Sequence, residues 1–119
     1  MSKPRSKMID YKGRIFRAVR GFTTEVHFGK QSKHLPGQQG YDPKRSPITL
    51  DITRIQALVE LKAGTGEWWG KNREVIDCGV IVGLYRDVRT GKSRPTSRAT
   101  IHYSQTGCHL VPAHPLTRS

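Results

Sequence analysis

The 119-residue sequence contains few acidic residues, only two cysteines and no long apolar run. No segment approaches the roughly 20 apolar residues that a membrane-spanning helix needs, and residues 1–20 lack the apolar centre of a signal peptide. We therefore expect no membrane association. We also expect any export to be directed by a sequence outside this chain.

Cys78 and Cys108 are the two cysteines, and their spacing does not match a C-x-x-C motif. Two cysteines cannot supply a four-ligand zinc site by themselves. At this length a single domain can fold without metals or disulfides. We expect two buried thiols, with a disulfide between them as the alternative.

Basic residues greatly outnumber acidic ones: 21 Lys and Arg stand against 9 Asp and Glu, giving a net charge of +12. Such an excess is typical of proteins that bind a polyanion. Residues 1–50 hold eleven basic and three acidic residues (11 − 3 = +8), and residues 51–119 hold ten and six (10 − 6 = +4). We expect the N-terminal half to form most of the polyanion-binding surface.

The hydrophobic pattern predicts an α+β fold, in which an N-terminal helical and looped part packs on an antiparallel sheet. We expect residues 1–20 to form a basic N-terminal segment, in which Ile15, Phe16 and Val19 could line one face of a short helix, and residues 21–119 to form the main domain. Apolar and polar residues alternate over residues 22–28, which predicts a half-buried strand.

Residues 29–47 contain three glycines and three prolines without a regular period, which predicts a long loop with a functional role. After it, Asp51 is a candidate N-cap for a helix that ends near Gly64. The apolar residues at helical spacing in this helix are Ile52, Ile55, Leu58 and Val59.

Residues 74–86 give the strongest strand signal, and residues 97–104 and 108–113 complete a predicted antiparallel meander. On the first of these strands, Gly79 and Gly83 would share the open face of the sheet. Two glycines there indicate either an open sheet surface that a ligand can approach closely or a local bulge or twist of the strand.

The last hairpin has a register that its apolar residues select. A four-residue loop over residues 104–107 pairs His102 with His109 and Ile101 with Leu110, which keeps the apolar residues on the core face. The two histidines then face each other on the open face, about 5 Å apart between Cβ atoms. Simple solvent exposure of these polar residues is the alternative.

A third histidine, His34, lies in the long loop beside Lys30, Gln31 and Lys33. Imidazoles that titrate near neutral pH, together with a cation, can cleave RNA through its own 2′-hydroxyl without a metal. Three histidines can also hold a catalytic zinc, although the neighbouring lysines would oppose it. We expect the other two histidines, His27 and His114, to be solvated.

The strings "GKQSKHLPGQQGYDPKRS" and "GVIVGLYRDVRTGKSRPTSRATIHYSQTGCHLVPAHP" resemble the bacterial polymorphic toxin type 50 domain, over about residues 26–115. The resemblance implies a ribonuclease toxin of the barnase-EndoU-colicin-RelE superfamily, the C-terminal effector of a larger bacterial or phage-associated protein. It implies action in the cytoplasm of a target bacterium and neutralisation by a cognate immunity protein, which the basic charge predicts to be acidic.

The candidate site residues come from these matching strings. Expected catalytic residues are His34, His102, His109, Lys33 and Ser104. Expected RNA contacts are Lys30, Gln31, Tyr41, Lys44 and Arg45. Which histidine is the acid and which is the base stays open, and we expect a monomer that uses no cofactor.

Metal-independent endoribonuclease activity is therefore the leading hypothesis. A non-catalytic RNA-binding protein is the first alternative, since the net charge alone would suffice for it. A metal-dependent nuclease is the second, and a chelator would inhibit it. The histidine pair favours an enzyme, because a binding protein needs arginines and lysines at that position.

Overall fold

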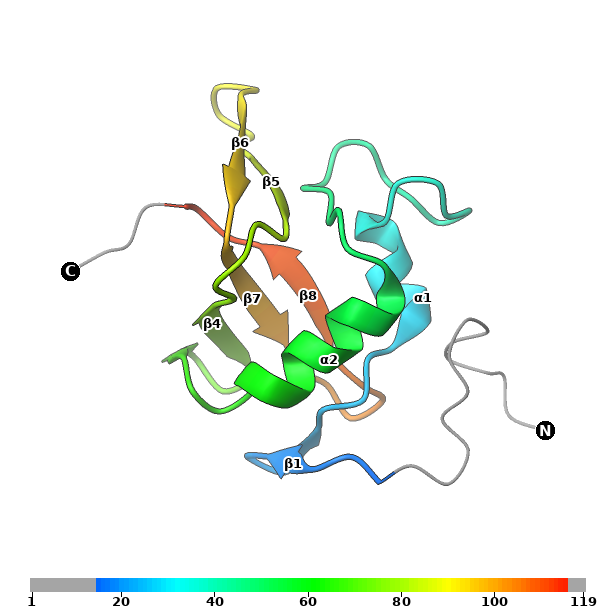
Figure 1. Ribbon diagram of the computed structural model, residues 1–119, viewed down its shortest axis with the longest axis vertical. Coiled ribbons are helices and arrows are strands. Elements are labelled where there is room, and N and C mark those ends of the chain that lie inside the picture. The colour runs from blue at the N-terminus through cyan, green and yellow to red at the C-terminus, as the bar shows by residue number, and fades with distance from the viewer. Residues whose placement is uncertain (1–14, 116–119) are drawn as a thin grey trace.

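A four-stranded antiparallel sheet of strand order β3-β4-β7-β8 forms the centre of the structure (Figure 1). The computed structural model describes residues 15–115. The strands are β3 (Glu67–Trp69), β4 (Arg73–Asp77), β7 (Arg98–His102) and β8 (His109–Pro112). The predicted α+β class is confirmed at this level, because short helices accompany antiparallel sheets.

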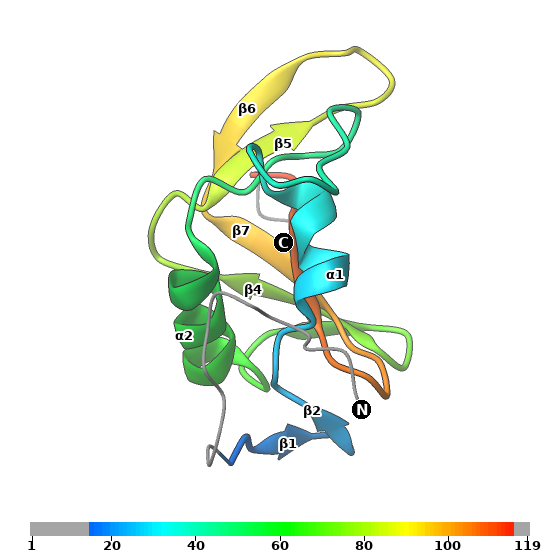
Figure 2. The same ribbon diagram turned by 90° about the vertical axis from the view of Figure 1, so that its right-hand side faces the viewer.

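Helices lie against the sheet in two places. Helix α2 (Ile52–Lys62) covers one face, while helix α1 (Phe28–Gln31) and the 3-10 turn η1 (Ser32–His34) lie beside β8 (Figures 1 and 2). Within residues 15–115, no helix is long and apolar enough to cross a membrane.

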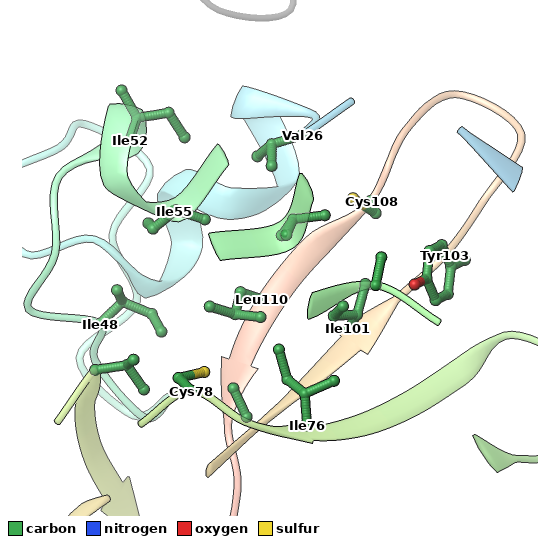
Figure 3. Packing of buried hydrophobic residues seen from close by; sticks show 14 of the residues in the cluster. Val26, Ile48, Ile52, Ile55, Ile76, Cys78, Ile101, Tyr103, Cys108 and Leu110 are labelled. Atoms are coloured by element: carbon green, nitrogen blue, oxygen red, sulfur yellow. The ribbon is translucent and has the colours of Figure 1, made fainter. Parts of the chain in front are cut away.

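The predicted helix after Asp51 is confirmed. The Asp51 side chain accepts a hydrogen bond from the Arg54 amide at 2.9 Å, and Gly64, with φ +93°, follows the last turn. The apolar face of α2 packs on the sheet, as Figure 3 shows. The buried residues in this layer include Ile52, Ile55, Val59, Ile76, Ile101 and Leu110.

Residues 74–86 do not form one strand, so that prediction is wrong. Strand β4 ends at Asp77, whose carboxylate accepts a hydrogen bond from the Gly79 amide at 3.0 Å, and Gly79 has φ +77°. The chain turns there, and β5 (Gly83–Arg86) pairs with β6 (Ser93–Thr96) in a separate two-stranded sheet. Strand β4 pairs instead with β3 on one side and with β7, which follows this inserted hairpin, on the other.

The two glycines of this segment do not form the floor of a site. Gly79 lies in the turn, and Gly83 is buried against the backbone of Pro47. A Cβ atom at Gly83 would lie 2.1 Å from the Pro47 carbonyl oxygen. The missing side chain at Gly83 therefore makes room for the protein's own backbone and not for a ligand.

The N-terminal predictions are corrected in detail. Ala18–Val19 (β1) and Phe22–Thr23 (β2) form a small hairpin, so the described part of the 1–20 segment contains a strand in place of the helix. Residues 1–14 lie outside the described residues. The predicted strand over 22–28 stops at Thr23, apart from a single parallel bridge between Val26 and Cys108.

The predicted loop over residues 29–47 is partly helical, because it contains most of α1 and all of η1. Its later part, residues 35–47, is irregular. The chain that follows it is attached to β5 by a bridge between Ile48 and Gly83.

The two cysteines are buried free thiols, as expected, and the disulfide alternative is wrong. Burial raises the pKa of Cys78 to about 11 and that of Cys108 to about 12. Both thiols are therefore protonated and unreactive at neutral pH.

The edge of β8 is completed first by main chain and then by a side chain. Cys108 bonds to the backbone of Glu25 and His27, at 2.9 and 2.8 Å. Two residues further on, the Leu110 amide donates to Gln31 Oε1 at 2.7 Å, and Gln31 Nε2 donates to the Leu110 carbonyl at 2.9 Å. The Gln31 amide thus replaces a strand residue, and the main chain is free to form α1 and η1.

Gln31 is fully buried, with none of its surface exposed. Its amide group is occupied by Leu110 on both sides, so it has a structural role in place of the RNA contact that we expected.

Gln31→Ala is predicted to lower the free energy of unfolding by about 3 kcal/mol, because two buried backbone groups each lose a partner worth about 1–3 kcal/mol. Denaturant titration measures the change. Gln39→Ala, at an exposed glutamine of the neighbouring loop, is the matched control and should unfold like the unmodified protein. Equal stability of the two variants would contradict the structural role of Gln31.

Candidate active site

A cavity of about 310 Å³ lies between the β7–β8 hairpin and the segment that contains α1, η1 and the following loop. It brings together seven of the ten predicted site residues. These are Lys30, Lys33, His34, Arg45, His102, Ser104 and His109. Tyr41, Lys44 and the buried Gln31 do not line it.

Three histidine rings lie next to one another in this cavity, with His109 in the middle. The predicted register is confirmed, since His102 pairs with His109 and Ile101 with Leu110. The ring centroids of His102 and His109 are 4.9 Å apart, and His34 stacks on His109 at 5.9 Å. The cluster therefore joins a turn near the N-terminus to two strands at the other end of the chain.

The surroundings of the three rings disfavour positive charge. Burial, together with the neighbouring His102 and His34, lowers the pKa of His109 to about 3. Burial and the nearby Arg73 lower the pKa of His102 to about 4. The pKa of His34 is also lowered, again mainly by burial, so all three imidazoles are neutral at pH 7.

The hydrogen bond of His34 fixes its tautomer. His34 Nδ1 lies 2.9 Å from the Ser46 carbonyl oxygen. Because a carbonyl can only accept, Nδ1 carries the proton of the neutral ring and Nε2 keeps its lone pair. Nε2 is therefore the ring nitrogen that can accept a proton from a substrate.

His109 differs from His34 in its ring contacts. Its Nδ1 atom is buried, and within residues 15–115 it has no hydrogen-bond partner. A protonated imidazole would need an acceptor at that nitrogen. The missing partner therefore disfavours the charged form of His109 further.

Ser104 holds Lys30 at the edge of the cavity. The Lys30 ammonium donates to Ser104 Oγ at 2.8 Å, while the Ser104 hydroxyl donates to the Gly107 carbonyl at 2.7 Å. A second bond, of 3.3 Å, runs from Lys30 to Thr106 Oγ1. These contacts give Ser104 a positioning role for a cation, since its own hydrogen is already engaged.

Arg45 reaches the cavity from the irregular loop, where Asp42 holds it. Arg45 Nε forms an ion pair with Asp42 Oδ2 at 3.2 Å, and the Asp42 amide donates to the Lys33 carbonyl at 3.0 Å. A hydrogen bond from the Lys44 amide, with help from Arg45, lowers the pKa of Asp42. Asp42 therefore links Lys33 and Arg45 on one rim of the cavity.

Two lining residues were not predicted, Asn72 and Tyr103. Asn72 exchanges hydrogen bonds with the backbone of Tyr103, at 3.0 and 2.8 Å. The Tyr103 hydroxyl donates to the fully buried Glu74 at 2.7 Å, and Glu74 also accepts from the amides of Gly64 and Gly66. An acidic residue on the core face of a strand was the sequence signal for this network.

His27 is also corrected, because it is half-buried and not simply solvated. It is the N-cap of α1, and its Nδ1 accepts a hydrogen bond from the Lys30 amide at 3.2 Å. His114 is exposed, as expected, and contacts Tyr85 edge-on.

The histidine cluster is not arranged as a metal site. The centroids of neighbouring rings are 4.9 and 5.9 Å apart, and the ring planes differ by 32° and 24°. In the part of the chain that the structure describes, no group of three His, Cys, Asp or Glu side chains is placed to hold a metal ion.

The lowered histidine pKa values predict that stability falls in mild acid. An unfolded histidine titrates near pH 6.5, so below that pH the unfolded chain binds protons that the folded chain does not. The stabilising effect is complete above pH 6.5 and is lost as the pH falls toward about 4, by at most about 1.4 kcal/mol per pH unit for each histidine. Denaturant unfolding between pH 7.5 and 5 measures this slope. His102→Gln should flatten it, and an unchanged slope would count against burial of the neutral ring.

One comparison with known proteins indicates a toxin domain. A family model described as "Bacterial toxin 50" matches residues 26–112, which include all three histidines of the cavity. The comparison with curated proteins gives no match. Since the match covers well over half of the sequence, the chain belongs to the bacterial toxin 50 family.

Proposed function

We propose that this toxin domain is a metal-independent endoribonuclease of the barnase-EndoU-colicin-RelE superfamily. The observation that carries the proposal is the cluster of three histidine rings in a cavity rimmed by Lys30, Lys33 and Arg45. Neutral imidazoles supply proton acceptors, and the cations attract a phosphodiester. Cleavage through the 2′-hydroxyl of RNA needs only these groups.

The proton transfers follow from the state of each ring. His34 acts as the base, because its unprotonated Nε2 can take the proton of the 2′-hydroxyl. The 2′-oxygen forms a bond to phosphorus, and the bond from phosphorus to the 5′-oxygen breaks. His102 or His109, charged once the phosphate is bound, gives its proton to the leaving 5′-oxygen.

The charge of the bound phosphate makes that acid available. A phosphate beside His102 and His109 is an opposite charge, which raises the pKa of a neighbouring imidazole. It also supplies an acceptor for a second ring N–H. The imidazoles are thus neutral in the empty site, and substrate binding itself favours the protonated form.

Lys30, Lys33 and Arg45 stabilise the negative charge that builds on the phosphorane. Ser104 contributes by holding Lys30 in place. Lys44 and Tyr41 lie outside the cavity, where they contact more distant parts of an RNA strand.

The biological setting is also part of the proposal. Membership in a toxin family supports delivery as the effector of a larger bacterial or phage-associated protein, with action in the cytoplasm of a target cell. The net charge of +12 supports a small acidic immunity protein that covers the basic cavity, since opposite potentials speed association.

Incubation of the purified domain with RNA in EDTA tests the function. Cleavage should continue in the chelator and leave 2′,3′-cyclic phosphate ends, because the 2′-oxygen is the nucleophile. Fragments with 3′-hydroxyl ends, or loss of cleavage in EDTA, would contradict the mechanism. RNA binding without any cleavage would favour the non-catalytic alternative.

Histidine variants serve as controls in the same assay. His34→Ala, His102→Ala and His109→Ala should each slow cleavage by about a hundredfold or more, the usual contribution of one acid or base. His114→Ala is the matched control, because this histidine is exposed and lies outside the cavity, and it should cleave normally. Full activity in one of the three cavity variants would remove that residue from the mechanism.

A further inference from the structure

The strand register places four large side chains in one row across the sheet. Trp69 pairs with Arg73, Arg73 pairs with His102, and His102 pairs with His109. Directly paired residues of antiparallel strands project to the same face. The row therefore extends from the histidine cluster across β7 and β4 to β3.

This row lies on the face of the sheet that α2 does not cover. The neighbouring row on the other face contains Glu74, Ile101 and Leu110, which are all fully buried. Trp69, by contrast, is 60% exposed, and Arg73 is also exposed. A large aromatic ring thus stays in contact with solvent on the catalytic face.

The two adjacent tryptophans differ sharply in their surroundings. Trp68 points to the core side, where it stacks with Tyr103 at 5.3 Å and lies under the Arg20 guanidinium. Trp69 belongs to the opposite face. Packing therefore accounts for Trp68 but not for Trp69.

The spacing of the row suits an RNA strand. Neighbouring strands are about 4.8 Å apart, so Trp69 lies about 10 Å from His102 along the row. That is within reach of the nucleotide next to a phosphodiester held by the histidines. Arg73 lies between the two, close enough to His102 for its charge to affect the ring.

We propose that Trp69 and Arg73 form a nucleotide subsite beside the cleaved bond, in which the indole stacks on a base and the guanidinium contacts an RNA phosphate. The occupant is single-stranded RNA, because a base must leave its own stack to lie on the indole. The basic charge of the row and cavity fits this ligand. The subsite rests on the proposed function for its place next to the reaction.

A binding experiment can test the subsite without cleavage. The probe is a short RNA whose 2′-hydroxyls are methylated, so that it cannot react, and the signal is tryptophan fluorescence. Binding should quench the emission, and Trp69→Phe should abolish most of the quenching while keeping most of the affinity. Trp69→Ala should weaken binding about tenfold, within the range for loss of one base–aromatic stack.

Leu61→Ala is the matched control, since this side chain is 70% exposed on α2, which covers the other face of the sheet (Figure 1). It should bind the probe like the unmodified protein. Cleavage assays on unmodified RNA then show whether the loss in Trp69→Ala lies mainly in KM. Because Trp69 is largely exposed, Trp69→Phe and Trp69→Ala should both fold, which circular dichroism can verify.

The outcomes separate the subsite from the proposed reaction. RNA cleavage with no effect of Trp69→Ala on binding or KM overturns the subsite and leaves the ribonuclease proposal intact. Binding that depends on Trp69, without RNA cleavage by the unmodified protein, overturns the ribonuclease proposal and supports the base-binding role. Quenching that persists in Trp69→Phe also overturns the subsite.

Discussion

The two hydrogen bonds between the Gln31 amide and the backbone of Leu110 hold the candidate site together. One side of the cavity comes from residues 30–45 and the other from the β7–β8 hairpin, beside which Asn72 also lines it. The amide occupies the edge of β8 where another strand would otherwise pair, and it leaves the chain free to turn helically. His34 therefore lies three residues beyond the bond that attaches its segment to the strand of His109.

A second buried glutamine repeats this use of an amide. Gln56 of α2 accepts from the Val26 amide at 2.8 Å and donates to the Thr24 carbonyl at 2.8 Å. The irregular segment that leads into α1 is thus fixed to α2, just as α1 is fixed to β8. Side-chain amides replace regular sheet pairing in the region where the chain must present cations and a histidine.

Burial of the histidines has an electrostatic consequence for the site. Charged imidazoles would add to the repulsion among Lys30, Lys33 and Arg45, whereas neutral rings let these cations gather around one cavity. In the proposed reaction a bound phosphate would reverse the balance, because a negative charge favours both the cations and a protonated imidazole. The same cavity can therefore be stable when empty and supply an acid when occupied.

The sequence predicts the parts of this structure that depend on local patterns. Alternating apolar residues select the register that pairs His102 with His109, and helical spacing after Asp51 predicts α2. The pattern fails over residues 74–86, because the alternation continues through a turn that Gly79 makes possible. A four-residue helix such as α1 is too short to show a period.

The remaining site features depend on pairing between distant segments. The role of Gln31 requires knowledge of which edge it meets, 79 residues away in the chain. The row from Trp69 to His109 requires β4 to pair with β7 across the inserted β5–β6 hairpin. Glu74 could be noticed as an acid on a core face, but its partners come from three other positions.

The central claim, that a phosphate controls the charge of a buried histidine cluster, is tested most directly by NMR titration of the histidine ring protons with and without a nucleoside 3′-monophosphate. We predict that His34, His102 and His109 titrate below pH 6.5 in the free protein, and that the bound phosphate raises the pKa of His102 or His109 by one unit or more. Rings that titrate near 6.5 in the free protein, or that do not respond to the phosphate, would contradict the account.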